Sequence, residues 1–323
     1  MTTNTKTTLP SYAELPIDPS RPPHSAWGVF GDDDEVGTIN LLTSERVAHA
    51  AALVRKGSVF SLNWDIEKPS PPVLGRKPLT HTYIDLQPGR DDFYDGLYPQ
   101  GSSQWDSLCH MMHPEYGFYN GRQPEDITGR PGSRNGIDNW ARRGIAGRFV
   151  LADVERWRAA QGRPVDNAEK DVITVDQLDA TLEAQGTQLD VGDILLIRLG
   201  WIGWYERQSQ ATRDELGAMP VPGMKTPGLS VDPRTDEWLW DRHLAAVASD
   251  VPALEALPYE PRVERFLHWR MIPLLGIAVG EMFVLDALAD DCAADGTYEG
   301  LFTAAPLHKI GGAGSPANAL AIK

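Results

Sequence analysis

The sequence predicts a mixed domain of helices and strands, of the α/β or α+β class, and three observations support this. Segments with helical spacing of apolar residues alternate with short apolar runs typical of buried strands. No long linker divides the chain after residue 26, and no repeat of about 20 to 50 residues occurs. With 323 residues, the chain can bury most of its unfolded surface without disulfide cross-links. One domain over residues 27–323 is therefore expected.

Residues 1–26 differ from the rest because they are rich in Thr, Pro and Ser. Such a composition favours an extended segment over a packed element. We expect an N-terminal arm that lies on the surface or on a partner subunit.

Two segments have the spacing and end signals of helices. The apolar residues of 44–56 share one face, and a glycine follows. In 174–185, Thr174 and Gln177 form a capping box and Gly186 stands behind the last turn. Both segments are predicted to be helical.

The predicted strands are short apolar or alternating runs. They cover residues 58–63, 80–86, 148–154, 193–199, 244–248 and 277–279.

Residues 112–145 are rich in Gly, Pro, Asn and Arg, and a loop this long is typically functional; we interpret it as lying on the substrate side. Residues 312–317 resemble half of a dinucleotide fingerprint, but no helix and strand can follow there, and we interpret them as a turn.

Composition excludes several classes of protein. The chain carries 45 acidic and 30 basic residues, a net charge of −15, which argues against binding to nucleic acid. Two cysteines are too few for a disulfide framework and indicate a reducing compartment. The first residues have no apolar leader, and the longest apolar run, 271–285, is too short to span a bilayer. We expect a soluble cytoplasmic protein with a small-molecule substrate.

The densest group of chemically active side chains lies in residues 104–110. Gln104 and Asp106 are two residues apart and share a face on a strand, and His110 reaches the same point if a helix begins there. An amide oxygen, a carboxylate and an imidazole together suit a divalent metal. The alternative is that Asp106 caps a turn and His110 is a hydrogen-bonded core histidine.

A second group combines His268 with Glu281, which ends an apolar run at 276–280. A carboxylate at the end of a buried strand needs a partner, because an unpaired buried charge is strongly disfavoured. The partner is a site of chemistry or, alternatively, a salt bridge to Arg265 or Arg270.

The ten tryptophans are a high count for this chain. Trp105 and Trp201 lie near polar groups and are predicted to line an aromatic or apolar substrate pocket, with an ordinary core position as the alternative for each. His113 is a candidate substrate contact at the mouth of the long loop, with an exposed loop histidine as the alternative.

Several segments carry a resemblance to a known family. They are Trp27-Gly28, 37–42, 136–153, 192–201, 227–230, Ser249-Asp250, Leu267-His268, Gly280-Glu281 and 314–316. In this order they resemble the putative cyclase family of metal-dependent hydrolases, which includes bacterial kynurenine formamidases and isatin hydrolases. The resemblance implies a small barrel-like sheet flanked by helices, and assembly as a homodimer or homotetramer.

The family motif H-x-x-x-H-x-D-x-x-x-H falls on residues 100–110. Asp106 and His110 match it, whereas Gln100 and Gln104 replace two histidines, and we interpret Gln100 as structural. The resemblance implies that His110 is the catalytic acid/base. It also implies one divalent ion, Mn²⁺ or Zn²⁺ with Mg²⁺ as a further candidate, held by a subset of Gln104, Asp106, His268 and Glu281.

The resulting hypothesis is hydrolysis of a carbon–nitrogen bond in an amide or cyclic amide. The ion would polarise the carbonyl and activate water, and His110 would move the proton. An ester or lactone would use the same chemistry. A family member that has lost catalysis and binds a ligand is the alternative, supported by Gln100 and Gln104. A serine hydrolase is disfavoured, because the sequence has no G-x-S-x-G motif.

Overall fold

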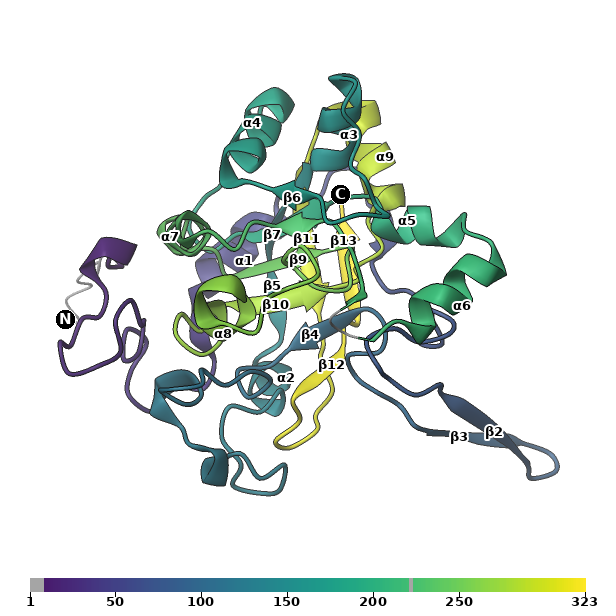
Figure 1. Cartoon of the computed structure of the whole chain (residues 1–323), viewed down its shortest axis with the longest axis horizontal. Helices are drawn as coiled ribbons and strands as arrows, with labels where there is room; N and C mark the ends of the chain where they lie inside the picture. Colours follow the sequence, from purple (N-terminus) through teal and green to yellow (C-terminus); the bar gives the residue numbers. More distant parts are fainter. Residues whose placement is uncertain (1–8, 221–222) are drawn as a thin grey trace.

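The computed structural model describes residues 9–220 and 223–323. The strands of its main sheet are β1 (Val59–Ser61), β4 (Gln104–Asp106), β5 (Ile145–Asp153), β7 (Ile194–Arg198), β9 (Ala246–Ser249), β10 (Ala278–Glu281), β11 (Glu299–Ala304), β12 (Gly314–Pro316) and β13 (Ala319–Ile322). Within the described residues their order is β1–β13–β11–β5–β7–β9–β10–β4–β12 (Figure 1). The sheet curls into a half-barrel, which confirms the predicted mixed fold with a barrel-like sheet.

The centre of the sheet is parallel and buried on both faces. Strands β5, β7, β9 and β10 run parallel to one another, whereas β11 pairs antiparallel with β5 at one side and β4 pairs antiparallel with β10 at the other. Residues 194–197 in β7 are fully buried. A strand covered on both faces has an unbroken apolar run rather than an alternating pattern, as this segment does.

The helices flank this sheet (Figure 1). Their bounds are α1 Ser44–Ala51, α2 Asp138–Arg143, α3 Val154–Ala160, α4 Val175–Gln185, α5 Trp201–Glu206, α6 Gln210–Ala218, α7 Pro233–Asp241, α8 His268–Met271 and α9 Asp286–Asp295. Across the two described ranges, no helix has both the length and the apolar character needed to cross a membrane.

The two predicted helices form, with one change of length. Thr174 accepts a hydrogen bond from the Gln177 backbone and Gly186 adopts a left-handed conformation, which confirms the predicted ends of α4. The helix predicted over 44–56 already ends at Ala51. It stops early because the Lys56 backbone N–H donates to the carbonyl of Lys323, which draws this segment to the edge of the sheet.

The predicted strands are present with shifted ends. Strand β5 begins three residues before the predicted 148 and ends at Asp153, whose side chain caps α3 by accepting from Arg156 N. The strand predicted at 80–86 is β2 (Thr80–Asp85), which pairs with β3 (Arg90–Asp95) in a hairpin that projects from the body (Figure 1). A further small pair consists of β6 (Val172–Ile173) and β8 (Gly228–Leu229).

The interpretation of 312–317 as a turn is wrong. Residues 314–316 form β12, which pairs with β4 so that Gly314 lies opposite Asp106 and Pro316 opposite Gln104. Glycine is required at 314, because a Cβ atom there would lie 2.7 Å from the backbone carbonyl oxygen of Trp105, which cannot move away as a side chain could. The C-terminal segment therefore supports the strand that carries two candidate site residues.

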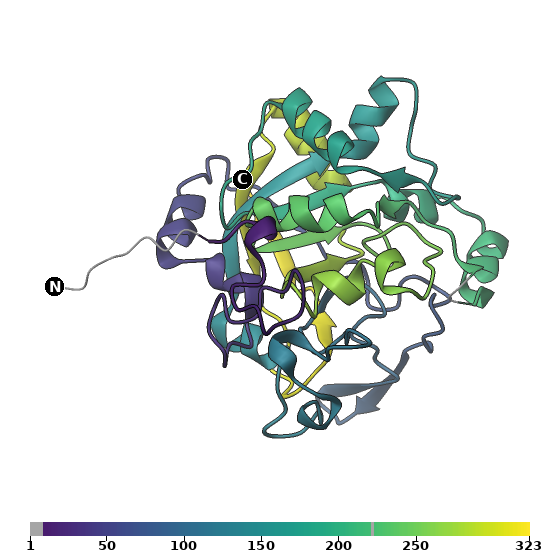
Figure 2. The same cartoon turned by 60° about the vertical axis from the view of Figure 1, so that its left-hand side comes forward.

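The structure describes residues 9–26 of the N-terminal arm, and the first of these, around Pro10 and Tyr12, lie against α7 (Figure 2). The Tyr12 backbone N–H donates to Asp241 Oδ1 at 2.6 Å, and Trp240 Nε1 donates to the Pro10 carbonyl at 2.8 Å. These contacts lie within one chain, and contact of the arm with a partner subunit stays a prediction. Residues 1–8 lie outside the described residues.

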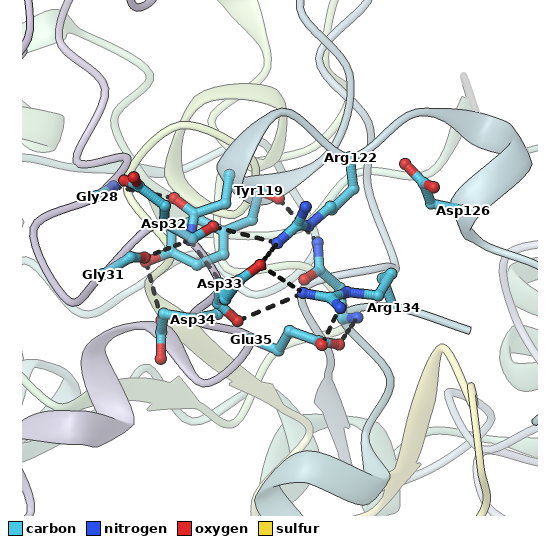
Figure 3. A network of polar contacts seen from close by, with 12 residues as sticks. Gly28, Gly31, Asp32, Asp33, Asp34, Glu35, Tyr119, Arg122, Asp126 and Arg134 are labelled. Atoms are coloured by element: carbon cyan, nitrogen blue, oxygen red, sulfur yellow. Dashed lines mark hydrogen bonds and ion pairs between the residues drawn. The ribbon is translucent and has the colours of Figure 1, made fainter. Parts of the chain in front are cut away.

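The long loop at 112–145 is anchored to an acidic turn near the N-terminus, and Figure 3 shows the network. Arg134 Nε lies 2.8 Å from Glu35 Oε1, and Arg122 Nη2 lies 3.2 Å from Asp33 Oδ1. Both arginines come from the loop, and both carboxylates come from the turn. The pairs hold the loop on the body of the protein.

Candidate active site

Three side chains with metal-binding atoms meet where β4, β10 and α8 come together. Asp106, His268 and Glu281 each offer one ligand atom, and these atoms all lie within 4.8 Å of one another. All three residues are buried. The register explains part of this, because antiparallel pairing of β4 with β10 places Gln104 directly opposite Glu281.

Several oxygens in this cluster lack partners. Gln104 donates its amide N–H to Glu281 Oε2 at 2.6 Å, and this contact does not use its own Oε1. Among residues 9–220 and 223–323, neither oxygen of Asp106 nor Oε1 of Gln104 has a hydrogen-bond partner. Buried acceptors without partners are costly, and a bound cation would satisfy them. Carboxylate, imidazole and amide oxygen together fit a divalent ion.

His268 is oriented by Glu255, a carboxylate that is not among the predicted site residues. Its Nδ1 lies 2.5 Å from Glu255 Oε2, and its Nε2 lies 3.0 Å from Glu281 Oε1 and 3.9 Å from Asp106 Oδ2. A carboxylate on one ring nitrogen fixes the tautomer that offers the other nitrogen to a metal. Glu255 follows a buried strand inside an apolar stretch, so the argument applied to Glu281 would have found it.

Charge and burial oppose each other at these residues. Burial would lower the pKa of His268, but Glu255 and Glu281 outweigh it and raise that pKa well above its ordinary value. Burial raises the pKa of Asp106, and the negative charge of Glu281 adds to this effect. A cluster with this many carboxylates around one imidazole attracts a cation.

His110 reaches Asp106 by a route other than the predicted helix. Its backbone N–H donates to the carbonyl of Ser107 at 2.9 Å, so a turn follows β4 and folds the side chain back. His110 Nε2 lies 3.7 Å from Asp106 Oδ1, and Nδ1 lies 3.4 Å from the Gln100 amide nitrogen. Burial lowers the pKa of His110 despite the nearby Asp106 carboxylate, which favours a neutral imidazole.

A cavity of about 190 Å³ opens onto this cluster. His110, His268 and Glu281 line one part of it. The aromatic rings of Tyr259 and Phe266 line another part and are stacked with centroids 4.1 Å apart. The cavity therefore combines polar groups suited to catalysis with a flat apolar wall.

The three predicted substrate contacts lie elsewhere. Trp105 has no exposed surface; it packs edge-on against Phe283 in the core, and its indole N–H donates to the Ala317 carbonyl. Trp201 is also fully buried, stacked on Tyr205. His113 lines a separate cavity under the N-terminal arm. All residues of the 112–145 loop are described, and none lines the cavity at the cluster.

The structural alternatives for Asp106 and Glu281 do not account for their contacts. Arg270 Nε donates to Asp236 Oδ2 at 2.8 Å, and Arg265 is exposed, so neither forms the alternative salt bridge to Glu281. The oxygens of Asp106 accept no hydrogen bond from the described residues, so Asp106 does not cap a turn.

Comparison with known proteins identifies the family. The profile described as Putative cyclase matches residues 61–256, more than half of the chain. A crystal structure described as a novel cyclase is 32% identical, with a TM-score of 0.81, and the match covers 93% of this chain and 97% of that one. The protein belongs to the Putative cyclase family. No curated protein matches the chain.

More distant structures share the fold. Isatin hydrolase A from Labrenzia aggregata, bound to benzyl benzoate, is 17% identical with a TM-score of 0.59, and the match covers 88% of this chain and 98% of that one. Isatin hydrolase A from Ralstonia solanacearum is 19% identical with a TM-score of 0.57, with 82% and 91% covered. At this identity the likeness establishes the architecture and leaves the chemistry to the site residues.

Proposed function

We propose that this protein is a metal-dependent hydrolase that cleaves the carbon–nitrogen bond of an amide or cyclic amide in a small aromatic or apolar substrate. One observation carries the proposal: the buried cluster of Asp106, His268 and Glu281 stands at a cavity, with both Asp106 oxygens lacking partners among the described residues. Kinship with a family whose fold is shared by isatin hydrolases supports the same reaction class.

The ligands of the ion would be Asp106, His268 and Glu281, with Gln104 Oε1 as a fourth candidate. When bound, a divalent ion supplies Lewis acidity, which polarises the attacked carbonyl and acidifies the attacking water. Mn²⁺ and Zn²⁺ both suit this donor set, and Mg²⁺ is a further candidate.

His110 moves the proton. It is neutral at neutral pH because burial lowers its pKa, and its Nε2 faces the cluster. In the structure the amide nitrogen of Gln100 lies nearest Nδ1; turning that amide over would present its oxygen to Nδ1 instead, and the ring would then hold its proton on Nδ1 and leave Nε2 free. His110 takes the proton from the attacking water at Nε2 and returns it to the leaving nitrogen. Glu255 keeps the His268 ring in place during this exchange.

Screening a panel of lactams, formamides and lactones with added Mn²⁺ or Zn²⁺ tests the proposal. We expect hydrolysis of a formamide or lactam by the wild-type protein and its loss in Asp106→Ala. Preference for lactones would shift the proposal to ester chemistry on the same residues. Activity that persists in Asp106→Ala would refute the assignment of the site.

The loss of two motif histidines favours a second candidate, a ligand-binding protein without catalysis. Gln104 donates to Glu281 Oε2 and so occupies one oxygen of a proposed metal ligand. Elemental analysis separates the two functions: about one metal ion per chain is expected for the enzyme. No bound metal, together with no rise in melting temperature on adding metal, would favour the binding protein.

A further inference from the structure

Arg76 stands in the wall of the same cavity with a donor that nothing in the described chain satisfies. It lines the cavity together with His110 and Glu281. Its Nη1 atom is buried and has no hydrogen-bond partner among the described residues. A guanidinium stays charged in proteins, so burying one of its N–H groups without an acceptor is costly. The missing acceptor is therefore expected to arrive with a ligand.

The nearby carboxylates do not serve as that acceptor. Glu281 and Asp106 attract Arg76 through space and oppose the lowering of its pKa by burial, yet neither hydrogen-bonds to its Nη1. Glu281 is already engaged: Oε1 accepts from the Leu254 backbone at 3.0 Å, and Oε2 accepts from Gln104. The Arg76 guanidinium therefore lies near the Asp106 and Glu281 carboxylates, but its Nη1 forms no hydrogen bond with them.

The other residues that line the cavity indicate which kind of ligand would carry the hydrogen-bond acceptor for Arg76. Tyr259 and Phe266 form the stacked aromatic wall, and Leu74 and Leu257 add apolar surface. A ligand that satisfies every wall has a flat apolar body and a group with hydrogen-bond acceptors. A carboxylate fits a guanidinium best, because its two oxygens match the planar N–H fork.

We propose that Arg76 binds a carboxylate of the substrate and makes the enzyme selective for aromatic amides that carry an acidic group. This inference rests on the proposed hydrolase function. It assigns Arg76 to recognition, whereas the proton transfer stays with His110. Arg76 and His110 line one cavity of about 190 Å³, so the carboxylate and the cleaved carbon–nitrogen bond belong to the same small molecule.

Specificity between two matched substrates tests this assignment. The probes are 2-formamidobenzoate and its neutral counterpart 2-formamidobenzamide, assayed with the Mn²⁺-loaded full-length protein. We expect the ratio of kcat/KM for the acid over the amide to fall about 10- to 100-fold in Arg76→Met, the loss typical of a charge-assisted hydrogen bond. Lys77→Met removes the same charge from the exposed neighbouring residue and should leave the ratio unchanged. An unchanged ratio in Arg76→Met overturns the assignment.

Binding of benzoate and benzamide gives a readout that does not depend on turnover. By titration calorimetry, the Kd of benzoate should rise about 10- to 100-fold in Arg76→Met, while benzamide should bind both proteins equally. If Arg76→Met does not fold, Arg76→Lys replaces it, because Lys keeps the charge but loses the fork. Equal benzoate affinity in the variant, or no benzoate binding to the wild type, overturns the inference.

The two experiments separate this inference from the function on which it rests. Arg76-dependent benzoate binding without hydrolysis of any panel compound would refute the hydrolase and keep the anion site. Hydrolysis with no dependence on Arg76 would keep the hydrolase and refute the anion site.

Discussion

Replacing Glu255 by Gln tests the metal centre through a residue that is not itself expected to bind the ion. Glu255 Oε2 lies 2.5 Å from His268 Nδ1, and Oε1 lies 3.4 Å from the His268 backbone nitrogen, all in a fully buried setting. The amide of Gln keeps one acceptor, so Glu255→Gln loses the charge and one of the two contacts. Loss of such a supporting carboxylate typically weakens metal binding about 10- to 100-fold, or roughly 1.4 to 2.7 kcal/mol.

Titration calorimetry with Mn²⁺ on chelator-treated protein measures this effect. Asp193→Asn is the matched control, because it also removes a buried carboxylate with a partner, Arg148, at 3.0 Å, but outside the cluster. We expect wild-type affinity in the control and weaker binding in Glu255→Gln. Equal Mn²⁺ affinity in the wild type and Glu255→Gln would refute the role of Glu255 in presenting His268.

Three further predictions address the proton, the base and the core. The raised pKa of His268 keeps this residue protonated at pH 7 in the metal-free protein, so Mn²⁺ must displace about one proton and its affinity should rise with pH. Calorimetry in buffers of different ionisation enthalpy counts the released proton. In His268→Gln this proton release should vanish. His110→Ala should lower kcat by about 10²- to 10⁴-fold, with wild-type Mn²⁺ binding as its control; unchanged kcat would remove the residue from the mechanism. Trp105→Ala should reduce the free energy of unfolding by about 3 to 5 kcal/mol in urea titrations, because the indole is fully buried; a loss below 1 kcal/mol, about that of an average substitution, would contradict a core role.

The alternation of side chains along a single strand predicts which residues share a face of that strand. The two-residue repeat places Gln104 and Asp106 on the same face of β4, as the structure has them. The same repeat turns Trp105 to the opposite face, where it joins the core. Applied consistently, alternation would have removed Trp105 from the predicted substrate contacts.

The role of a residue cannot be predicted from the local sequence when it depends on contacts between segments that are distant in the chain. Arg76 and the strand β12 have no local pattern that predicts their neighbours, whereas Glu255 stands in an apolar stretch after a buried strand, where the argument applied to Glu281 would have identified it. Their roles follow from which strands pair in the curled sheet, and strand order is not written in the periodicity of any one segment. His268 was identified from family resemblance combined with its pairing to Glu281, since a single histidine carries little signal by itself.

The pairing of β12 with β4 has a consequence for how this protein matures. Asp106 leaves the ribosome long before residues 314–316, yet β4 has neither of its sheet neighbours until β10 and then β12 have been made. Synthesis proceeds at about 5 to 20 residues per second, so β4 lacks at least one of its two neighbouring strands for roughly ten seconds or more after its own synthesis. During that interval the exposed edge of β4 offers a docking point for chaperones or for unwanted strand addition.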